Sequence, residues 1–338
     1  MSENGKVGVG IIGAGNIAGH HIKGYLLARE HAQVAAIADV DTDRARAYEA
    51  QLGDFEVFAD YRDMLAAPLD AVDICLPHHL HKDAIVAAAG AGKHILCEKP
   101  LCLTLEEAEA VTSAVRAAGV TLMCAHNQLY LPAMAAARHM LDEGRLGKLF
   151  AARTTDVFAL NVTAESMGWR THRATSGGGE LIDTGYHPNY LLLHLVDSDP
   201  VRVAAMLSRH RLTFIEGEDT AHVLVEFADG TIGSIFTGWA YEPPGSTERF
   251  SVVGEEGSLW SDGIGLIHKP RGGAQVTILE SNGAKPDTYA LEVVEFVACL
   301  RENRRPLHTE VEGVNVLKLI LGAYESAQSG RIVELKNL

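Results

Sequence analysis

The 338-residue sequence contains no run that approaches the ~20 consecutive apolar residues that a membrane-spanning helix needs. Its short polar start, Met1–Lys6, is not followed by the apolar core and cleavage site of a secretion signal. We therefore expect a soluble, cytoplasmic protein that does not partner a membrane.

Basic side chains are also scarce. Lys and Arg number 29 against 44 Asp and Glu, which gives a formal net charge of −15. A negative surface repels phosphate backbones and anionic lipid head groups, so nucleic acid is not an expected partner. Any anionic ligand must be held by local groups that act against this overall field.

Cysteine pairs at metal or redox spacing are missing as well. The chain has five cysteines and no C-x-x-C pair. Cys75, Cys97 and Cys124 lie in apolar, strand-like runs, so we expect buried thiols and no metal site. The length suits two domains whose cores are large enough to need neither disulfides nor metals.

The first third of the chain alternates apolar strands with helical stretches. Thr104 and Glu107 form a capping-box pattern at the start of the clearest helix, and Gly119 follows its end. This repetition predicts a doubly wound parallel sheet, an α/β Rossmann domain over residues 1–126. The expected strands are Lys6–Ile12, Val34–Ala38, Glu56–Phe58, Ala71–Leu76, His94–Cys97 and Thr121–Ala125, and the expected helices are Ile17–Ala28, Asp43–Gln51, His81–Ala91 and Leu105–Ala118.

After about Asn127 the strands become longer and alternate in polarity, and Asp229-Gly230 is a hairpin signal. We predict an α+β domain over residues 127–338, with a large, mostly antiparallel open sheet and helices on one face. The expected strands are Lys148–Ala159, Val201–His210, Thr220–Phe227, Thr231–Trp239, Phe250–Gly254, Ser258–Ser261, Gly265–His268, Gln275–Glu280 and Ile332–Leu335, and the expected helices are Pro132–Glu143, Tyr289–Glu302 and Gly313–Ser329.

The pattern Gly13-x-Gly15-x-x-Ala18 joins the first expected strand to the first expected helix. Glycines there allow a tight turn and close approach of the backbone to a pyrophosphate, and the helix N-terminus favours negative charge. Asp39 ends the second strand at the spacing of a ribose-binding acid, although it could instead cap the next helix. Together these features predict dinucleotide binding.

Asp39 also bears on the choice of dinucleotide. A carboxylate accepts hydrogen bonds from the ribose hydroxyls and repels a 2′-phosphate. Val40 stands where a phosphate-binding site would carry a basic residue. NAD is therefore the expected cofactor, with NADP less favoured because only Arg44 and Arg46 could reach its phosphate.

Two further segments follow strands at the carboxyl edge of the expected parallel sheet, where ligands of such sheets bind. One is Glu98-Lys99-Pro100, which could also be a simple ion pair. The other is Leu76-Pro77-His78-His79 with His81. No carboxylate or cysteine accompanies these histidines at ligand spacing, so we expect cofactor contacts there rather than a metal.

A glycine-rich run, Gly177-Gly178-Gly179-Glu180-Leu181-Ile182-Asp183-Thr184-Gly185-Tyr186-His187, is the third signal. On a helix, Asp183 and His187 would share a face, which suits proton transfer but is also common in surface pairs. Pro188 is expected to kink or end that helix at His187.

These motifs, with Trp169-Arg170 and the tail segments Glu312-Gly313, Ala323–Ser326 and Gly330-Arg331, resemble the glucose-fructose oxidoreductase / inositol dehydrogenase / MocA (Gfo/Idh/MocA) family over essentially the whole chain. The resemblance implies that Lys99 orients substrate and nicotinamide, that Asp183 binds substrate and supports the base, and that His187 is the general acid/base. The residues expected to contact the cofactor are Gly13, Ala14, Gly15, Asn16, Ile17, Asp39, Leu76, Pro77, His81, Glu98, Lys99, Asn127, Trp169 and Arg170.

The chain departs from the family pattern at two places. Tyr190 stands where an Asp often follows the His, and Asn127-Gln128-Leu129 lacks the Arg often found after the Asn. The family pattern therefore does not define substrate recognition near these positions. The candidate specificity segments are Asp156–Arg173 and Trp239–Pro244.

The expected function is NAD-dependent hydride transfer to or from a secondary alcohol or ketone of a sugar, cyclitol or glycoside. One alternative keeps the cofactor and oxidises a ring carbon only transiently, as in a glycosidase or epimerase without net redox. Another is a non-catalytic dinucleotide sensor, which has no need of Lys99, Asp183 and His187 together. The resemblance and the open sheet imply a homodimer or homotetramer.

Overall fold

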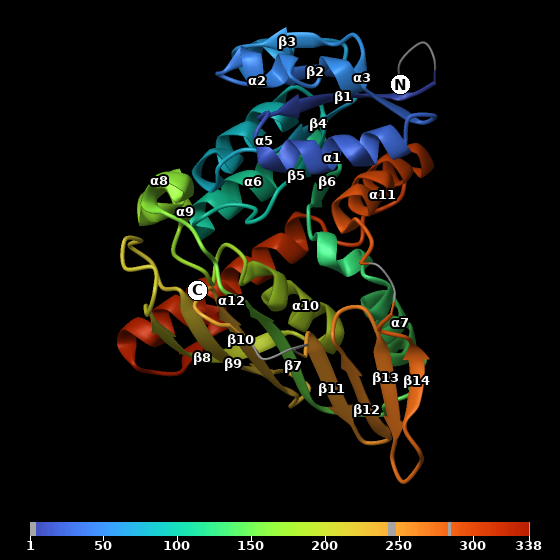
Figure 1. Ribbon diagram of the computed structural model, residues 1–338, viewed down its shortest axis with the longest axis vertical. Coiled ribbons are helices and arrows are strands. Elements are labelled where there is room, and N and C mark those ends of the chain that lie inside the picture. The colour runs from blue at the N-terminus through green and yellow to red at the C-terminus, as the bar shows by residue number, and fades with distance from the viewer. Residues whose placement is uncertain (1–4, 243–247, 283–284, 338) are drawn as a thin grey trace. The chain divides into compact units, whose positions relative to one another are not determined.

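The computed structural model describes residues 5–242, 248–282 and 285–337 (Figure 1). They form two compact units. Unit 1 comprises Met1–Asn127 and Asp287–Val314, and unit 2 comprises Gln128–Pro286 and Asn315–Leu338. Among the described helices, none has the length and apolar character required to cross a membrane.

Unit 1 contains a six-stranded sheet in the order β3-β2-β1-β4-β5-β6, and every neighbouring pair is parallel. This is the doubly wound Rossmann order, so the predicted fold class of the first domain is confirmed. The central strands β1 and β4 form because their residues are almost all apolar, and every residue of both strands is buried, including Asp73 in β4. The strands are β1 Val7–Ile12, β2 Ala32–Ala38, β3 Glu56–Phe58, β4 Ala71–Ile74, β5 His94–Cys97 and β6 Leu122–Cys124.

The helices of unit 1 mostly begin and end near the expected residues. Thr104 caps α6 by accepting from Glu107 N–H at 3.2 Å, while the Glu107 carboxylate accepts from Leu103 N–H at 2.8 Å. The expected helix Asp43–Gln51 is wrong, because two short helices with a break at residues 47–48 replace it. The helices are α1 Asn16–Leu27, α2 Thr42–Arg46, α3 Glu49–Leu52, α4 Tyr61–Met64, α5 His81–Gly90, α6 Leu105–Ala118 and α11 Thr288–Glu302, with 3-10 turns at η1 His78–Leu80 and η2 Asn127–Tyr130.

Unit 2 contains a nine-stranded sheet in the order β14-β13-β12-β11-β7-β10-β9-β8-β15. Among the strand pairs that the structure describes in this sheet, only β7–β10 is parallel, which confirms the mostly antiparallel sheet predicted for the second domain. The strands are β7 Leu149–Val157, β8 Pro200–Ser208, β9 Thr220–Phe227, β10 Ile232–Gly238, β11 Phe250–Gly254, β12 Gly257–Ser261, β13 Leu266–Pro270, β14 Val276–Leu279 and β15 Val333–Glu334.

The strand β8 is shorter than the expected Val201–His210. The buried carboxylate of Asp219 accepts hydrogen bonds from the N–H groups of His210, Arg211 and Leu212, at 2.7 to 3.0 Å. These N–H groups donate to one side chain, so they do not continue the hydrogen bonding between β8 and its neighbouring strand. This side chain therefore sets the end of β8.

The two faces of this sheet differ in composition. Along β9, residues Ala221, Val223, Val225 and Phe227 are buried, while His222 and Leu224 between them are exposed. Helix α10 packs against β7 and β10 on the buried face (Figure 1). The helices of this unit are α7 Pro132–Asp142, α8 Ala164–Met167, α9 Arg173–Ser176 and α10 Tyr186–Val196, with η3 Gly168–Thr171 and η4 Leu335–Asn337, and α12 Glu310–Ser329 begins in unit 1 and ends in unit 2.

All five cysteines, Cys75, Cys97, Cys102, Cys124 and Cys299, are free and buried. Burial raises the pKa of the Cys75 thiol to about 12. The predicted role of the strand cysteines as buried thiols is therefore confirmed.

Candidate active site

The glycine turn of unit 1 joins the end of β1 to the start of α1. Gly13 has a φ of +95°, and a Cβ there would lie 2.6 Å from the backbone oxygen of Cys75, so glycine is required. A Cβ at Gly15 would meet no protein atom within 4 Å. Helix α1 begins at Asn16, and a helix N-terminus attracts negative charge. The turn, which includes Ala14 and Ile17, has the space and the electrostatics that a pyrophosphate requires.

Asp39 directly follows β2, at the carboxyl end of the sheet. Its Oδ2 accepts a hydrogen bond from Ala14 N–H at 2.7 Å, and its Oδ1 accepts from Asp41 N–H at 2.8 Å. The N-cap residue of α2 is Asp41, so Asp39 does not cap that helix. The carboxylate holds the glycine turn, and each oxygen keeps a second lone pair that can accept a ribose hydroxyl.

The loops after β4 and β5 carry the other cofactor contacts predicted in unit 1, at residues 76–77 and 98–99. His81 is buried at the start of α5, where Nε2 lies 2.8 Å from the carbonyl oxygen of Leu76 and Nδ1 lies 2.7 Å from that of Pro100. Burial lowers the pKa of His81, although both carbonyl contacts oppose this shift. The imidazole joins the two loops, and its contact with the cofactor remains a prediction.

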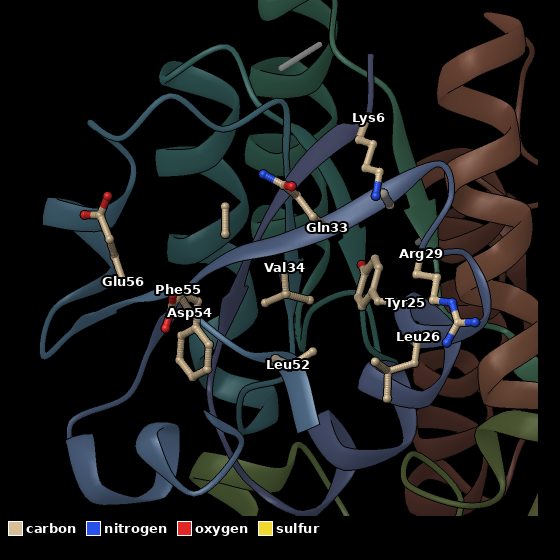
Figure 2. Close-up of a pocket in the computed structure, with 12 residues that line it drawn as sticks. Lys6, Tyr25, Leu26, Arg29, Gln33, Val34, Leu52, Asp54, Phe55 and Glu56 are labelled. Atoms are coloured by element: carbon tan, nitrogen blue, oxygen red, sulfur yellow. The ribbon is translucent and has the colours of Figure 1, made fainter. Parts of the chain in front are cut away.

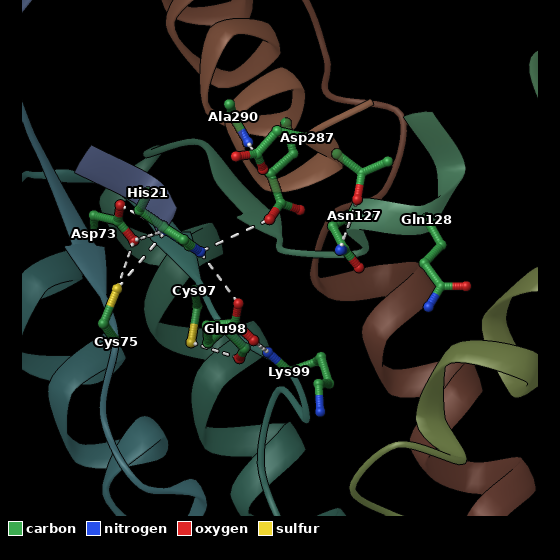
Figure 3. Close-up of polar contacts among 12 residues, drawn as sticks. His21, Asp73, Cys75, Cys97, Glu98, Lys99, Asn127, Gln128, Asp287 and Ala290 are labelled. Carbon is green, nitrogen blue, oxygen red and sulfur yellow. Dashed lines mark hydrogen bonds and ion pairs between the residues drawn. The ribbon is translucent and has the colours of Figure 1, made fainter. Parts of the chain in front are cut away.

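A buried cluster centred on His21 lies next to Glu98 (Figure 3). His21 Nδ1 is 2.9 Å from Asp73 Oδ2, and Nε2 is 3.2 Å from Glu98 Oε1. Burial alone would lower the pKa of His21, but the charge and hydrogen bond of Asp73 raise it well above its usual value. Burial would raise the pKa of Glu98, but the hydrogen bond and charge of His21 lower it. His21 is therefore an imidazolium between two buried carboxylates.

Glu98 connects this cluster to Lys99. Its Oε2 accepts a hydrogen bond from the backbone N–H of Lys99 at 3.0 Å. The side chain of Lys99 extends away from the cluster in Figure 3. The Glu98 carboxylate therefore fixes the backbone at Lys99 while its other oxygen contacts His21.

Two triplets in the cluster have ligand atoms within 4.8 Å of one another: His21 with Asp73 and Cys75, and His21 with Glu98 and Glu292. Burial raises the pKa of Glu292 well above its usual value; His21 opposes this shift, and Glu98 and Asp73 add to it. The contacts of the His21 ring with Asp73, Glu98 and Glu292 account for the short distances between these ligand atoms, so we assign no metal to the cluster.

Asn127 follows the last strand of the parallel sheet. Its Nδ2 donates to Thr288 Oγ1 at 2.9 Å, and both residues are buried. This bond fixes the predicted cofactor contact at residue 127 to the first residue of α11.

In unit 2, a loop over residues 177–185 carries Asp183. The backbone of Gly179 passes so close to Glu218 that a Cβ would lie 2.0 Å from its carbonyl oxygen. The Glu218 Oε1 accepts from Leu181 N–H at 2.9 Å and from the Tyr324 hydroxyl at 3.0 Å. The triple glycine therefore permits close backbone packing that fixes the loop before Asp183.

Glu180 lies in the same loop and is completely buried. Burial raises its pKa well above the usual value, while the hydrogen bonds from Thr237 and Thr184 to its Oε1 oppose the shift. Burial therefore favours the protonated form of Glu180, and its contacts with Thr184 and Thr237 connect the loop to β10.

Asp183 pairs with Arg170, the residue predicted to contact the cofactor. Arg170 Nε donates to Asp183 Oδ2 at 2.6 Å, and the guanidinium carbon lies 4.2 Å from the centre of the Trp169 ring. Asp183 is 5% exposed. Three predicted site residues from two separate motifs therefore lie together.

His187 lies in the first turn of α10. A helix that contains both Asp183 and His187, and that Pro188 kinks or ends at His187, is not observed, because α10 begins at Tyr186 and continues past Pro188 to Val196. Proline is tolerated in a first turn, where its missing N–H would have no acceptor within the helix. His187 Nδ1 lies 2.8 Å from the hydroxyl oxygen of Tyr190.

The two segments predicted to determine specificity meet in an apolar cluster. Met167, Leu212, Ile215 and Trp239 form its buried part, and Phe158, Leu160 and Val162 pack against it. Pro243 and Pro244, at the end of the second segment, lie outside the described residues. A separate surface pocket of unit 1, of about 580 Å³, is lined by the end of α1, the first residues of β2 and the segment between α3 and β3, and contains none of the predicted site residues (Figure 2).

The residues that support the candidate site are not predicted by the sequence motifs. His21, Asp73 and Glu292 lie far apart in the chain, and none belongs to a motif. In the sequence, Tyr190 is only a departure from the family pattern. A polar residue at that spacing from His187 is the one signal that could have identified it as a hydrogen-bond partner.

Two family models match the chain. Residues 7–126 match the model described as "Oxidoreductase family, NAD-binding Rossmann fold", and residues 134–260 match "GFO/IDH/MocA C-terminal domain". D-xylose 1-dehydrogenase (NADP(+)) 2 of Haloferax volcanii is 30% identical, over 96% of this chain and 99% of that protein. The chain belongs to the Gfo/Idh/MocA oxidoreductase family. This confirms the resemblance noted in the sequence.

Other members share the full length. The scyllo-inositol 2-dehydrogenase (NAD(+)) of Bacillus subtilis is 27% identical, over 98% of this chain and 96% of that protein. A levoglucosan dehydrogenase solved with NADH and levoglucosan superimposes with a TM-score of 0.89 at 25% identity, over 98% of this chain and 99% of that one. The chain is an NAD(P)-dependent oxidoreductase of the dehydrogenase type.

Proposed function

We propose that the protein transfers hydride between NAD and a secondary alcohol or ketone of a sugar, cyclitol or glycoside. The observation that carries the proposal is the pair of anchored groups in unit 2: Asp183 held by Arg170, and His187 held by Tyr190. The names of the relatives, which act on an inositol, a pentose and an anhydrosugar, support this substrate class.

In the proposed reaction His187 accepts the hydroxyl proton while the carbinol hydrogen leaves as hydride. Bound NAD supplies the acceptor for that hydride. Lys99 stabilises the oxyanion that develops on the substrate, and Asp183 accepts a hydrogen bond from a neighbouring hydroxyl. Because only a neutral imidazole accepts a proton, oxidation should become faster as the pH rises and His187 loses its proton.

The cofactor preference rests on Asp39. Its carboxylate repels a 2′-phosphate, and Val40 beside it is 95% exposed and offers no positive charge. We expect tighter binding of NADH than of NADPH, measured by fluorescence titration. Asp39→Asn keeps an acceptor for Ala14 N–H and removes the negative charge, so it should reduce the difference between the affinities for NADH and NADPH. Equal affinities of the unmodified protein would contradict this assignment.

A polyol panel tests the activity itself. The protein is mixed with NAD and with inositols, pentoses, hexoses and anhydrosugars, and reduced nicotinamide is followed by absorbance. Net reduction supports the proposal, and His187→Asn should slow it by about 10²–10⁴-fold. Turnover of a nitrophenyl glycoside without net reduction would favour the cofactor-retaining alternative. Cofactor binding with neither reaction would favour the sensor.

We also propose that the open face of the nine-stranded sheet joins copies of this chain into a homodimer or homotetramer. A hollow of about 1060 Å³ on this face is lined by residues of β7–β10, by residues 241, 242 and 248, and by residues of the segment 326–332. Met206, Leu224 and Ile332 there are 82%, 56% and 63% exposed. Apolar side chains at this density are typical of an interface.

We also propose the division of the chain into a cofactor-binding domain, 1–126, and a substrate-binding and oligomerisation domain, 127–338.

A further inference from the structure

We propose that Tyr190 is a positioning residue for the acid/base His187, and that its hydroxyl selects the ring nitrogen at which the substrate proton is taken up. The inference rests on the proposed function, because it concerns the same imidazole. It adds a residue that no sequence motif identifies.

The contact between the two side chains is built into the first turn of α10. Residues three apart on a helix lie on the same side, and Tyr190 Oη is 2.8 Å from His187 Nδ1. The rings meet nearly edge to face, at 81° with centroids 5.6 Å apart. Tyr190 has no exposed surface and His187 is 6% exposed, so water does not compete well for this bond.

Tyr190 is itself held in place from the other side. Its hydroxyl oxygen accepts a hydrogen bond from the backbone N–H of Gln128 at 3.0 Å. The side-chain oxygen of Gln128 accepts from Arg249, which also pairs with Asp156 at 2.6 Å. A continuous set of polar contacts therefore runs from β7 through Gln128 and Tyr190 to the imidazole.

These contacts bear on which nitrogen reacts. A neutral imidazole carries one proton, and a general base must offer the other nitrogen. Since Tyr190 occupies Nδ1, proton uptake from the substrate takes place at Nε2, and Nδ1 must carry the ring proton. The Tyr190 oxygen has two lone pairs, so it can accept from Gln128 N–H and from His187 Nδ1–H together. The substrate hydroxyl proton then moves to Nε2, and Nδ1–H stays on the ring.

A merely structural role predicts different behaviour. If Tyr190 only filled the core and held Gln128, phenylalanine would lower stability, because Gln128 N–H loses its acceptor, but it would leave the chemistry of His187 unchanged. A change in kcat, in the pH profile or in the imidazole tautomer is expected only if the bond to His187 matters. Tyr190→Phe therefore separates the two roles without creating a large cavity.

The control is Thr154→Val. The buried Thr154 hydroxyl donates to the Pro188 carbonyl at 2.8 Å, so the substitution removes a bond to the same turn of α10 without touching the imidazole of His187. Both variants and the parent protein are compared by thermal melting, NADH titration and steady-state kinetics over pH on the best substrate of the polyol panel.

We expect Tyr190→Phe to lower kcat by about 10-fold to 100-fold, with KM and NADH affinity within about twofold, and to change the rising limb of the pH profile. Thr154→Val should lower the melting temperature and leave kcat and the pH profile unchanged. An unchanged kcat and pH profile in Tyr190→Phe would overturn the inference.

A spectroscopic measurement keeps the inference testable if no substrate of the panel reacts. Nitrogen-15 NMR of the histidine rings, with His187 assigned by its loss in His187→Asn, reports the tautomer directly. The parent should show the Nδ1–H form at neutral imidazole, and Tyr190→Phe should show a mixture with more Nε2–H. Equal populations in the two proteins would refute the role of Tyr190, whereas inactivity of the parent on every substrate would refute the proposed function.

Discussion

Replacing His21 by alanine removes the positive partner of two buried carboxylates. His21, Asp73 and Glu98 are all buried, and the imidazole contacts them at 2.9 and 3.2 Å. Removing one partner of a buried ion pair costs about 3–5 kcal/mol, because the remaining charge has no compensation. For a unit of this size, about 2–4 °C per kcal/mol converts this to a loss of roughly 6–20 °C in melting temperature.

The neighbouring residue provides a matched control. His20 lies on the same helix and is exposed, with its ring 5.0 Å from that of Tyr289. His20→Ala should cost about 0.5–1.5 kcal/mol at most, the value of an aromatic contact. The stabilities of both variants and of the parent are measured by calorimetry and by urea unfolding. The two variants make the same substitution, histidine to alanine, at neighbouring positions.

The pH dependence gives a second check. The pKa of His21 is raised in the folded protein, so its stabilisation is complete below the unfolded pKa, about 6.5, and is lost as pH rises through the folded pKa. The difference between parent and His21→Ala should therefore be larger at pH 6 than at pH 9. If the two histidine variants melt alike at both pH values, the assignment of His21 as a buried imidazolium is wrong.

Three further outcomes are expected. Glu180→Gln should stabilise the protein at pH 8 but not at pH 4, in denaturant melts, because the raised pKa of Glu180 means that the parent loses stability as pH rises. Lys99→Ala should reduce turnover by about 10²-fold or more with little change in NADH affinity or melting temperature. If Lys99 only formed a structural ion pair, the variant would instead lose melting temperature and keep its turnover. Leu224→Lys, on the open sheet face, should reduce the mass measured by light scattering, and a monomeric parent would disprove the proposed interface.

Much of the fold could be predicted from local pattern. The near-continuous apolar runs identified the parallel strands, because such strands are buried on both faces. The alternation at Thr220–Phe227 identified a strand with one exposed face, and β9 has those bounds. Element ends were less predictable. The end of β8 depends on Asp219, a residue that directly precedes β9 and whose side chain accepts hydrogen bonds from the N–H groups of residues 210–212.

The candidate site divides in the same way. The sequence by itself predicted the glycine turn, which the structure has with a φ at Gly13 that favours glycine, and its motifs gave Asp39, Lys99, Asp183 and His187 as candidates. Only the tertiary structure decided what holds these groups. The contact of His21 with Glu98 joins residues 77 apart in the chain, and that of Tyr190 with Gln128 joins residues 62 apart. Such partners come from different strands and helices, so they are fixed by the order in which the chain builds the sheet and not by any local spacing.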